Sequence, residues 1–179
     1  MTSMGLEARI RRIEDRLEIA DLQARYAIHI DDHDLEKVGP LFAREGRFRS
    51  VDGVMDAIGR EAICAQYQGR FAALKFGFHV THDHLITLDA DDPDSAHGIV
   101  SSHAEVVRNA EPMVVGMRYH DRYVREDDAW RFADRLLHFF YYLPVDQYRA
   151  ALLTRERMRA YGDARTADLP EGTPTYSTE

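Results

Sequence analysis

The chain has 179 residues, of which 45% are hydrophobic and 30% are charged, and its formal net charge is −8 at pH 7. These values predict one globular domain with a sizeable core and exclude a disordered polymer. The acidic balance also argues against binding to nucleic acids and anionic membranes, because like charges repel at long range.

Cysteine content and hydropathy indicate the compartment. Cys64 is the only cysteine in the sequence, so neither an intrachain disulfide nor an all-cysteine zinc site can form. The N-terminus alternates charged and apolar residues, and the sequence lacks the long uncharged run of a signal peptide or a membrane span. We therefore expect a cytoplasmic protein with no membrane partner.

A helical hydrophobic period extends from Glu7 to about Ile30. At 100° per residue, the charged side chains share one face of this helix and the apolar ones share the other. The same count places Asp31 on the apolar side, so we expect its carboxylate to point inward. Three shorter elements are predicted next, namely a helix capped by Asp34, a strand over Phe48–Val54 and a helix over Gly59–Phe71.

The period then changes to about two. Four runs have the pattern of strands, over Phe78–Leu88, Ala96–Arg108, Met113–Arg125 and Trp130–Tyr142. The spacers between them have the length of hairpin loops, so neighbouring strands should be antiparallel. Helices followed by an antiparallel meander predict an α+β fold, unlike the βαβ order of a nucleotide-binding sheet.

The C-terminal part should complete the domain. A last helix is predicted over Val145–Tyr161, so the domain would span residues 1–162. Residues 163–179 are rich in Pro, Thr and Asp and would form a flexible tail.

Histidines are the most informative residues for a metal site, and the densest run is His79-Val80-Thr81-His82-Asp83-His84. In an extended strand His82 and His84 share the face opposite His79, and together with His103 they could form a His-x-His metal site. No carboxylate follows on the same strand at the spacing of a cupin site. We therefore expect no metal and no cofactor.

A second possibility is a catalytic pair between the inward Asp31 and one strand histidine. An imidazole can act as a base near neutral pH, and a carboxylate on its other nitrogen fixes the tautomer and stabilises the imidazolium. The competing interpretation is that Asp31 is a helix cap and the histidine a packing residue. Arg135 lies in an apolar strand, so it must either form an ion pair with a nearby carboxylate or face a polar cavity.

Four short motifs occur in a fixed order along the chain. They are Ile19–Tyr26 followed by Asp31 and Leu41-Phe42, then His79-x-x-x-Asp83 before Ile86-Thr87-Leu88-Asp89, then Tyr119-x-Asp121-x-Tyr123, and finally Trp130-Arg131-Phe132-x-x-Arg135. This order resembles the SnoaL-like branch of the nuclear transport factor 2-like superfamily, roughly from Glu7 to Leu143. The resemblance implies a cone-shaped α+β barrel, in which a curved antiparallel sheet and an N-terminal helical cap surround an apolar pocket.

Within that superfamily the spacing is most similar to scytalone dehydratase, bile acid 7α-dehydratase and hexachlorocyclohexane dehydrochlorinase. Those enzymes perform metal-free elimination with an Asp–His dyad, and Asp31 and His79 stand at its positions. The resemblance thus implies a cofactor-independent lyase, of the dehydratase or dehydrohalogenase type, acting on a hydrophobic cyclic or polycyclic small molecule. We assign substrate binding to Tyr26, Phe48, His103 and Arg135.

Two features differ from the family pattern. Asp83 stands where the family usually has Asn, which would place a second carboxylate near His79. The more apolar face of the same strand carries Phe78, Val80, Ile86 and Leu88, opposite His79. Because one fold serves many functions, a non-catalytic binding protein and a ketosteroid-isomerase-like isomerase remain alternatives.

Apolar residues also occupy both faces of the predicted strands. Met113 and Val115 lie on one face of their strand and Val114 on the other. Burial on one side only would give a clean polar alternation, and a second face left in water would expose a large apolar patch. We therefore expect a homotrimer or homodimer formed through the outer face of the sheet. The alternative is that the Val145–Tyr161 helix covers this face within one chain.

Overall fold

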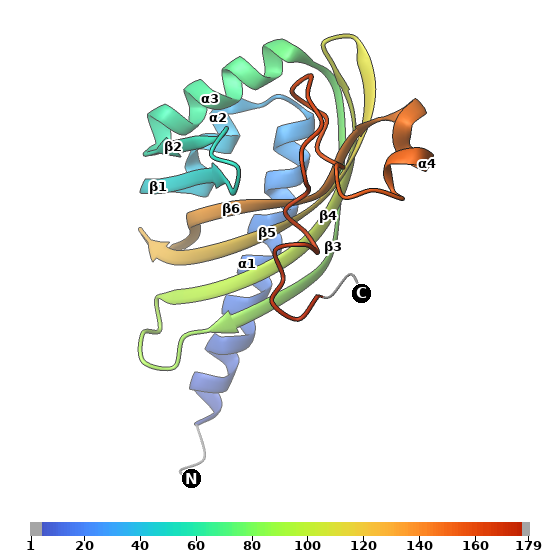
Figure 1. The fold of residues 1–179 in the computed structure, drawn as a ribbon. Helices are drawn as coiled ribbons and strands as arrows, with labels where there is room; N and C mark the ends of the chain where they lie inside the picture. The colour runs from blue at the N-terminus through green and yellow to red at the C-terminus, as the bar shows by residue number, and fades with distance from the viewer. Residues whose placement is uncertain (1–4, 177–179) are drawn as a thin grey trace.

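Six strands form one curved, open sheet with the order β2-β1-β6-β5-β4-β3, and helices close one side of it (Figure 1). The computed structural model describes residues 5–176. The helices are α1 (Leu6–Asp31), α2 (Leu35–Val38), α3 (Arg60–Ala73) and α4 (Tyr148–Ala151). The strands are β1 (Phe42–Ser50), β2 (Asp56–Ile58), β3 (Leu74–Leu88), β4 (Ser95–Arg108), β5 (Glu111–Glu126) and β6 (Ala129–Pro144).

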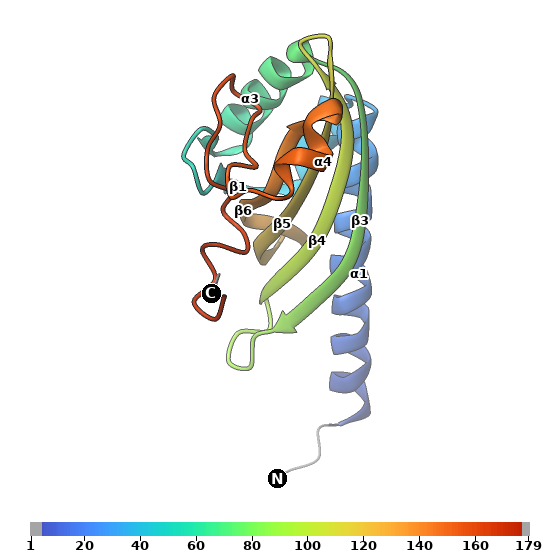
Figure 2. The ribbon, with the colours of Figure 1, turned by 45° about the vertical axis from the view of Figure 1, so that its right-hand side comes forward.

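This arrangement confirms the predicted α+β fold with a curved sheet and an N-terminal helical cap. Strands β3 to β6 form the expected antiparallel meander, whereas β1 pairs with β6 in parallel. The strand expected at Phe48–Val54 begins earlier, at Phe42, and β2 was not predicted. Helix α1 runs alongside the edge strand β3, and α3 crosses the opposite end of the sheet near β1 and β2 (Figures 1 and 2). No helix in the described part of the chain is long and apolar enough to span a membrane.

Only the second half of α1 contributes an apolar face to the core. Ile19, Tyr26 and Ile30 are buried there at helical spacing, because this half lies against the sheet. The first half extends beyond the sheet (Figure 2), and Ile13 and Leu17 are exposed. The apolar stripe predicted from Glu7 is therefore real as a pattern, but its first half has no partner within the described chain.

A bulge in β3 changes which side chains face the core. Before it, the side chain of His79 is mostly buried while Phe78 is half exposed. After it, Ile86 is buried while Leu85 is exposed. The register against β4 shifts between Thr81 and His84, and one extra residue reverses the alternation of inward and outward positions. The predicted apolar face shared by Phe78 and Ile86 is therefore wrong, and the conflict with an inward His79 disappears.

The predicted C-terminal helix is also wrong for most of its length. It is limited to a 3₁₀ turn at Val145–Gln147 and to α4. After α4 the chain returns to the sheet, where the Tyr142 amide donates to the Arg157 carbonyl at 2.8 Å and the Arg159 amide donates to the Tyr142 carbonyl at 2.9 Å. Backbone pairing with β6 thus replaces the helical hydrogen bonds that the sequence pattern suggested.

Contacts with the sheet continue past residue 162, where the predicted domain ends. The Leu169 amide donates to the Phe139 carbonyl at 3.0 Å, and the Asp168 carboxylate accepts from the Phe139 amide at 2.8 Å. Ala167 and Leu169 are buried. The first part of the predicted tail therefore packs against β6, and residues 177–179 lie outside the described range.

The outer face of β5 and β6 carries a pair of histidines that predicts acid sensitivity. The rings of His120 and His138 are 4.3 Å apart between centroids. Burial, followed by the charges of His120 and Arg118, lowers the pKa of His138 from 6.5 to about 4. The unfolded chain therefore binds a proton at His138 below about pH 6.5, whereas the folded chain resists it until about pH 4.

Above about pH 6.5, His138 is neutral in both the folded and the unfolded chain and does not reduce the free energy of unfolding. As the pH falls from 6.5 toward 4, proton binding to the unfolded chain lowers that free energy. We expect the free energy of unfolding in urea to fall from pH 7.5 to pH 5, with His138 supplying about 1 kcal/mol after allowance for solvent screening. The His138→Gln variant should show a smaller fall. His97→Gln is the control, because His97 is exposed and its replacement should leave the pH dependence unchanged. Equal pH dependence in the wild type and His138→Gln would contradict the assignment.

Exposed apolar side chains remain on the outside of the fold. Phe76 and Phe78 of β3 are each about half exposed, and Ile10, Ile13 and Leu17 of α1 are also exposed. Such patches are uncommon on soluble monomers. The predicted homo-oligomer should therefore give two or three times 20.6 kDa in light scattering at micromolar concentration, and a mass near 20.6 kDa would contradict it.

Candidate active site

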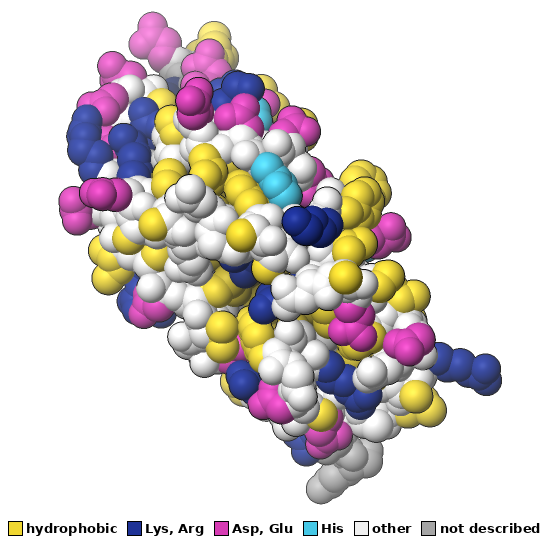
Figure 3. All heavy atoms as spheres, turned by 90° about the horizontal axis from the view of Figure 1, so that it is seen from above, with side chains coloured by type: hydrophobic (Ala, Val, Ile, Leu, Met, Phe, Trp, Pro, Cys, Tyr) yellow, Lys and Arg dark blue, Asp and Glu magenta, His cyan; other side chains and the backbone are white. Residues whose placement is uncertain are grey.

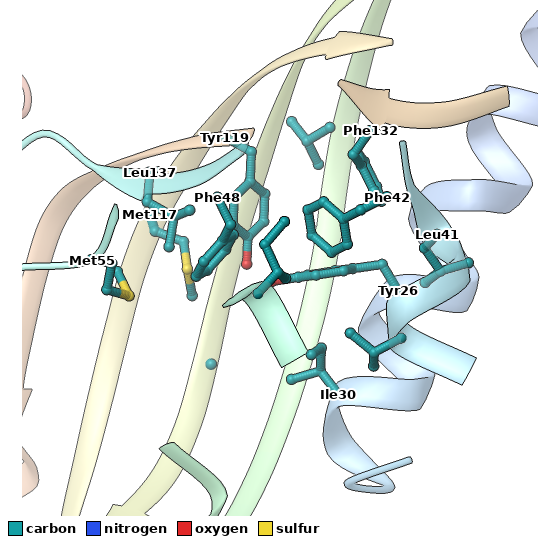
Figure 4. Packing of buried hydrophobic residues seen from close by; sticks show 14 of the residues in the cluster. Tyr26, Ile30, Leu41, Phe42, Phe48, Met55, Met117, Tyr119, Phe132 and Leu137 are labelled. Carbon is teal, nitrogen blue, oxygen red and sulfur yellow. The ribbon is translucent and has the colours of Figure 1, made fainter. Parts of the chain in front are cut away.

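The concave side of the sheet encloses an apolar cavity of about 30 Å³, the space of roughly one water molecule. Side chains from α1, α3 and five strands line it, including Ile30, Phe48, Met117 and Leu137. In Figure 4 the side chains of these four residues, together with those of Tyr26 and Tyr119, point into one common space. The cavity also receives His79 and Arg70, so a few polar groups converge on an apolar space.

Asp31 holds His79 at two points. Its Oδ1 lies 2.6 Å from the His79 ring Nδ1, and its Oδ2 accepts from the His79 backbone amide at 2.8 Å. An ionised carboxylate only accepts, so Nδ1 must carry a proton and donate it. The other ring nitrogen, Nε2, is then the unprotonated one in the neutral imidazole, and His79 lines the cavity. This is the arrangement of an oriented base.

The position of Asp31 is unusual for a carboxylate. It is the last residue of α1, and the C-terminal end of a helix carries a partial negative charge that disfavours an anion. The two hydrogen bonds from His79 compensate for this. Gly77 lies opposite Asp31, where a Cβ would make an ordinary van der Waals contact with Oδ1 at 3.4 Å. Asp83 is exposed in the bulge, and within residues 5–176 the carboxylate that contacts His79 is Asp31.

Two tyrosine hydroxyls form a second polar group in the cavity wall. The oxygen atoms of Tyr26 and Tyr67 are 2.6 Å apart, and either one can be the donor. When one donates to the other, the acceptor keeps a proton that it can offer to a ligand. Burial raises the pKa of Tyr67 well above its usual value, so this phenol stays protonated. The sequence identified Tyr26 but not Tyr67.

Arg135 lies behind the cavity rather than in its wall. Its side chain is fully buried, and it donates to both carboxylate oxygens of Asp121 at 2.9 and 2.7 Å and to Gln23. Its Cζ lies 4.1 Å from the Tyr26 ring centroid and 3.8 Å from that of Phe132. The assignment of Arg135 to substrate contact is therefore corrected. The ion pair with a carboxylate of the neighbouring strand, which the sequence analysis left open, is the one found.

His103 does not reach the cavity. It is exposed on the outer face of β4, where its Nδ1 lies 2.6 Å from the Nε2 of His82. His84 is on the other side of the bulge and contacts the Tyr123 hydroxyl at 3.1 Å. The bulge thus separates the three histidines considered as metal ligands, and residues 5–176 contain no cluster of three or more His, Cys, Asp or Glu suited to a metal ion.

The structure therefore brings together Asp31, His79, Tyr26 and Phe48 and leaves out His103 and Arg135. Tyr67 and Arg70 are the residues that sequence reasoning missed. Both belong to the helix predicted over Gly59–Phe71. The sequence did contain a signal, because the large side chains of Ile63 and Tyr67 are four residues apart and therefore share one face of a helix. In the structure both are buried on the inward face of α3.

Comparison with known proteins identifies relatives of this fold. The SnoaL-like domain family matches residues 11–136. Hexachlorocyclohexane dehydrochlorinase LinA-type3 from Novosphingobium barchaimii LL02 has a TM-score of 0.69 at 16% identity, covering 76% of this chain and 94% of that one. A putative scytalone dehydratase from Novosphingobium aromaticivorans DSM 12444 has a TM-score of 0.70 at 17% identity, covering 89% of this chain and 95% of that one.

Rv3472 from Mycobacterium tuberculosis, described as a protein of unknown function, is 26% identical, with a TM-score of 0.66 and 84% of each chain covered. A search of curated proteins finds no match. At 16% and 17% identity, the likeness to the dehydrochlorinase and the putative dehydratase shows a shared fold and does not by itself transfer a reaction.

Proposed function

The chain belongs to the SnoaL-like domain family, and we propose that it is a cofactor-independent lyase that eliminates water or a halide from a hydrophobic cyclic small molecule. The observation that carries the proposal is the 2.6 Å contact between Asp31 and the His79 Nδ1 beside an apolar cavity. Relatives of the same fold include a dehydrochlorinase and a putative dehydratase, which supports the reaction class by analogy.

His79 is the base in this proposal. Its Nε2 takes a proton from the carbon next to the one that carries the leaving group, and the C–H electron pair forms the new double bond. The leaving group departs with its own bonding pair, as halide or, once protonated, as water. Asp31 fixes the tautomer that exposes Nε2 and stabilises the imidazolium that forms.

The tyrosine pair would serve the leaving group. A departing hydroxyl needs a proton, and the pair can offer one from Tyr26 or Tyr67 in a site that excludes most water. A hydroxyl donor of this kind matters less for a halide, which leaves as a stable anion. The two classes of substrate should therefore depend differently on the pair.

Substrate entry requires the cavity to widen. Pockets that hold small organic ligands commonly measure about 300–1,000 Å³, whereas this cavity holds about 30 Å³. Arg70 near the end of α3 and Tyr142 near the end of β6 are among the side chains that line it. Movement of these side chains would open the cavity without disturbing the Asp31–His79 pair.

The test of this proposal is a screen of the purified protein against hydroxylated and halogenated cyclic compounds, with products measured by mass spectrometry. Loss of water or of hydrogen halide is the expected result. A rearranged product of unchanged mass would instead indicate an isomerase. An intact ligand that copurifies and does not turn over would indicate a binding protein, and either of these two outcomes would refute the lyase.

Removal of one hydroxyl from the tyrosine pair should lower turnover more for alcohols than for halides. We expect Tyr67→Phe to reduce kcat about 10- to 100-fold on a hydroxylated substrate, because the remaining Tyr26 hydroxyl loses the hydrogen bond that it shares with Tyr67. The effect on a halogenated substrate should be severalfold at most. Tyr176→Phe, at an exposed position, is the control. Equal effects on both substrate classes would remove the pair from the mechanism.

A further inference from the structure

Two arginines lie at or beside the wall of the cavity. Arg70, in the last turn of α3, lines the cavity together with Tyr67 and His79. Arg108, at the end of β4, has its Cζ 6.0 Å from the ring centroid of Tyr142, which also lines the cavity. Figure 3 shows the molecule from above, the end of the fold where α3 stops and β3 begins, and basic side chains lie there among apolar ones.

Both guanidinium groups act on the same phenol. Tyr161 lies in the segment that returns to β6, and the Arg108 Cζ is 5.1 Å from its ring centroid. Burial raises the pKa of Tyr161, the Asp52 carboxylate adds to this rise, and the positive charges of Arg70 and Arg108 oppose it. Arg70 and Tyr142 both line the cavity, and the Arg108 Cζ lies 6.0 Å from the Tyr142 ring centroid, so both guanidinium groups lie close to this cavity.

These two arginines lack the carboxylate partners that several other half-buried arginines have. Several other half-buried arginines pair with carboxylates, namely Arg49, Arg60, Arg125, Arg131 and Arg157. Within residues 5–176, neither Arg70 nor Arg108 has a carboxylate within ion-pair distance. Arg70 donates to the Sδ of Met55, a weak acceptor. The Nε of Arg108 is buried and has no hydrogen-bond partner in the described chain.

A partly buried guanidinium without an anion is costly, and the cost is removed when an anion arrives. The planar fork of arginine fits a carboxylate through two parallel hydrogen bonds. The nearby Asp52 does not supply this anion, because within the described chain it forms no ion pair with either arginine; its Oδ1 accepts from the Ser50 hydroxyl and the Val54 amide. Arg70 and Arg108 therefore keep guanidinium donors for which the described chain supplies no anion.

We propose that the substrate carries a carboxylate, which Arg70 and Arg108 hold while its apolar ring lies beside His79. The inference deepens the proposed function and rests on it only in taking this cavity as the substrate site. It also adds one charged group to a ligand that the apolar lining alone describes as hydrophobic.

Binding of two matched probes tests the inference. Cyclohexanecarboxylate and the neutral cyclohexanecarboxamide have similar shapes and differ in charge. In isothermal titration calorimetry the acid should bind at least about tenfold more tightly than the amide. The preference should fall below about threefold in Arg70→Gln and in Arg108→Gln, and it should weaken as salt rises. Equal affinities in the wild type, or no binding of the acid at millimolar concentration, would overturn the inference.

Arg118→Gln is the matched control. Arg118 is also half buried and outside any ion pair within residues 5–176, but it lies on the outer face over the Phe140 ring, so its removal should leave the preference intact. Arg70→Lys should keep part of the preference because the charge remains. Loss of the preference in Arg118→Gln as well would refute a specific site.

Stability and turnover separate this inference from its alternatives. Removal of an unpaired charge should leave the unfolding midpoint of Arg70→Gln unchanged or higher, whereas a purely structural arginine would lower it. His79→Ala should keep the preference for the acid, because binding to the two arginines does not need the base. If the preference is present but no compound in the screen is eliminated, the carboxylate site stands and the lyase fails.

Discussion

Replacement of His79 by Ala is expected to lower turnover by about 10²- to 10⁴-fold while the fold is retained. The side chain supplies the base, and no other imidazole lines the cavity among residues 5–176. The His79 ring is mostly buried, and its hydrogen-bond partner is Asp31. Its loss therefore removes the base and one hydrogen bond, which the fold should tolerate. The measurement is kcat on a substrate found by the mass-spectrometric screen, with circular dichroism as the check on folding. His82→Ala is the matched control, because His82 lies on the same strand and faces outward.

Asp31→Asn should have an effect of similar size for a reason that the geometry supplies. Both carboxylate oxygens of Asp31 accept, one from the His79 ring and one from the His79 amide. An asparagine has one acceptor oxygen, so one of these contacts would become a meeting of two donors. Either the amide loses its partner or the imidazole changes tautomer and turns a protonated nitrogen toward the substrate.

The exposed neighbour Asp32 provides the control for this variant, since Asp32→Asn changes the same charge at the same helix end without touching His79. Full turnover in both Asp31→Asn and His79→Ala would exclude the dyad from the mechanism. Loss of turnover in Asp32→Asn would instead point to the charge of the helix end rather than to the hydrogen bonds.

The sequence predicted which helices and strands form this site better than it predicted which side chains point into it. Helical counting placed Asp31 inward, and it ends α1 facing His79 as expected. Strand alternation failed for His79, because a bulge between Thr81 and His84 exchanges the two faces of β3. A bulge is set by how two strands pair in three dimensions, and a single sequence gives no direct sign of it.

The partner of Arg135 illustrates the same limit. Counting back from the turn, where Glu126 pairs with Ala129, a regular hairpin would place Asp121 opposite Asp134. The observed register shift near Arg122 moves Asp121 opposite Arg135 instead. A shift of one residue thus keeps Asp121 away from Asp134 and places it opposite Arg135, where the two form a buried ion pair. The sequence therefore suggested an ion pair for Arg135 but did not identify its partner.

Breaking that ion pair is expected to cause a large loss of stability. Both side chains are fully buried, so Arg135→Met leaves the Asp121 charge without a counterion in a dry interior. Losses of about 3–5 kcal/mol are typical of this situation. The guanidinium also packs against the rings of Tyr26, Tyr119 and Phe132 at 4.1, 4.3 and 3.8 Å, and these cation–π contacts are lost as well.

A comparison with a second arginine makes this prediction sharp. Arg49 pairs with Asp134 through two hydrogen bonds of 3.0 and 2.7 Å, but this pair is partly exposed. Arg49→Met should therefore cost less than about 1 kcal/mol in urea unfolding. Similar losses for Arg49→Met and Arg135→Met would contradict the role of burial. In the double variant with Asp121→Leu, part of the loss should return because the unpaired charge is gone, but not all of it, because Tyr123 and Gln23 then lose their hydrogen-bond partners.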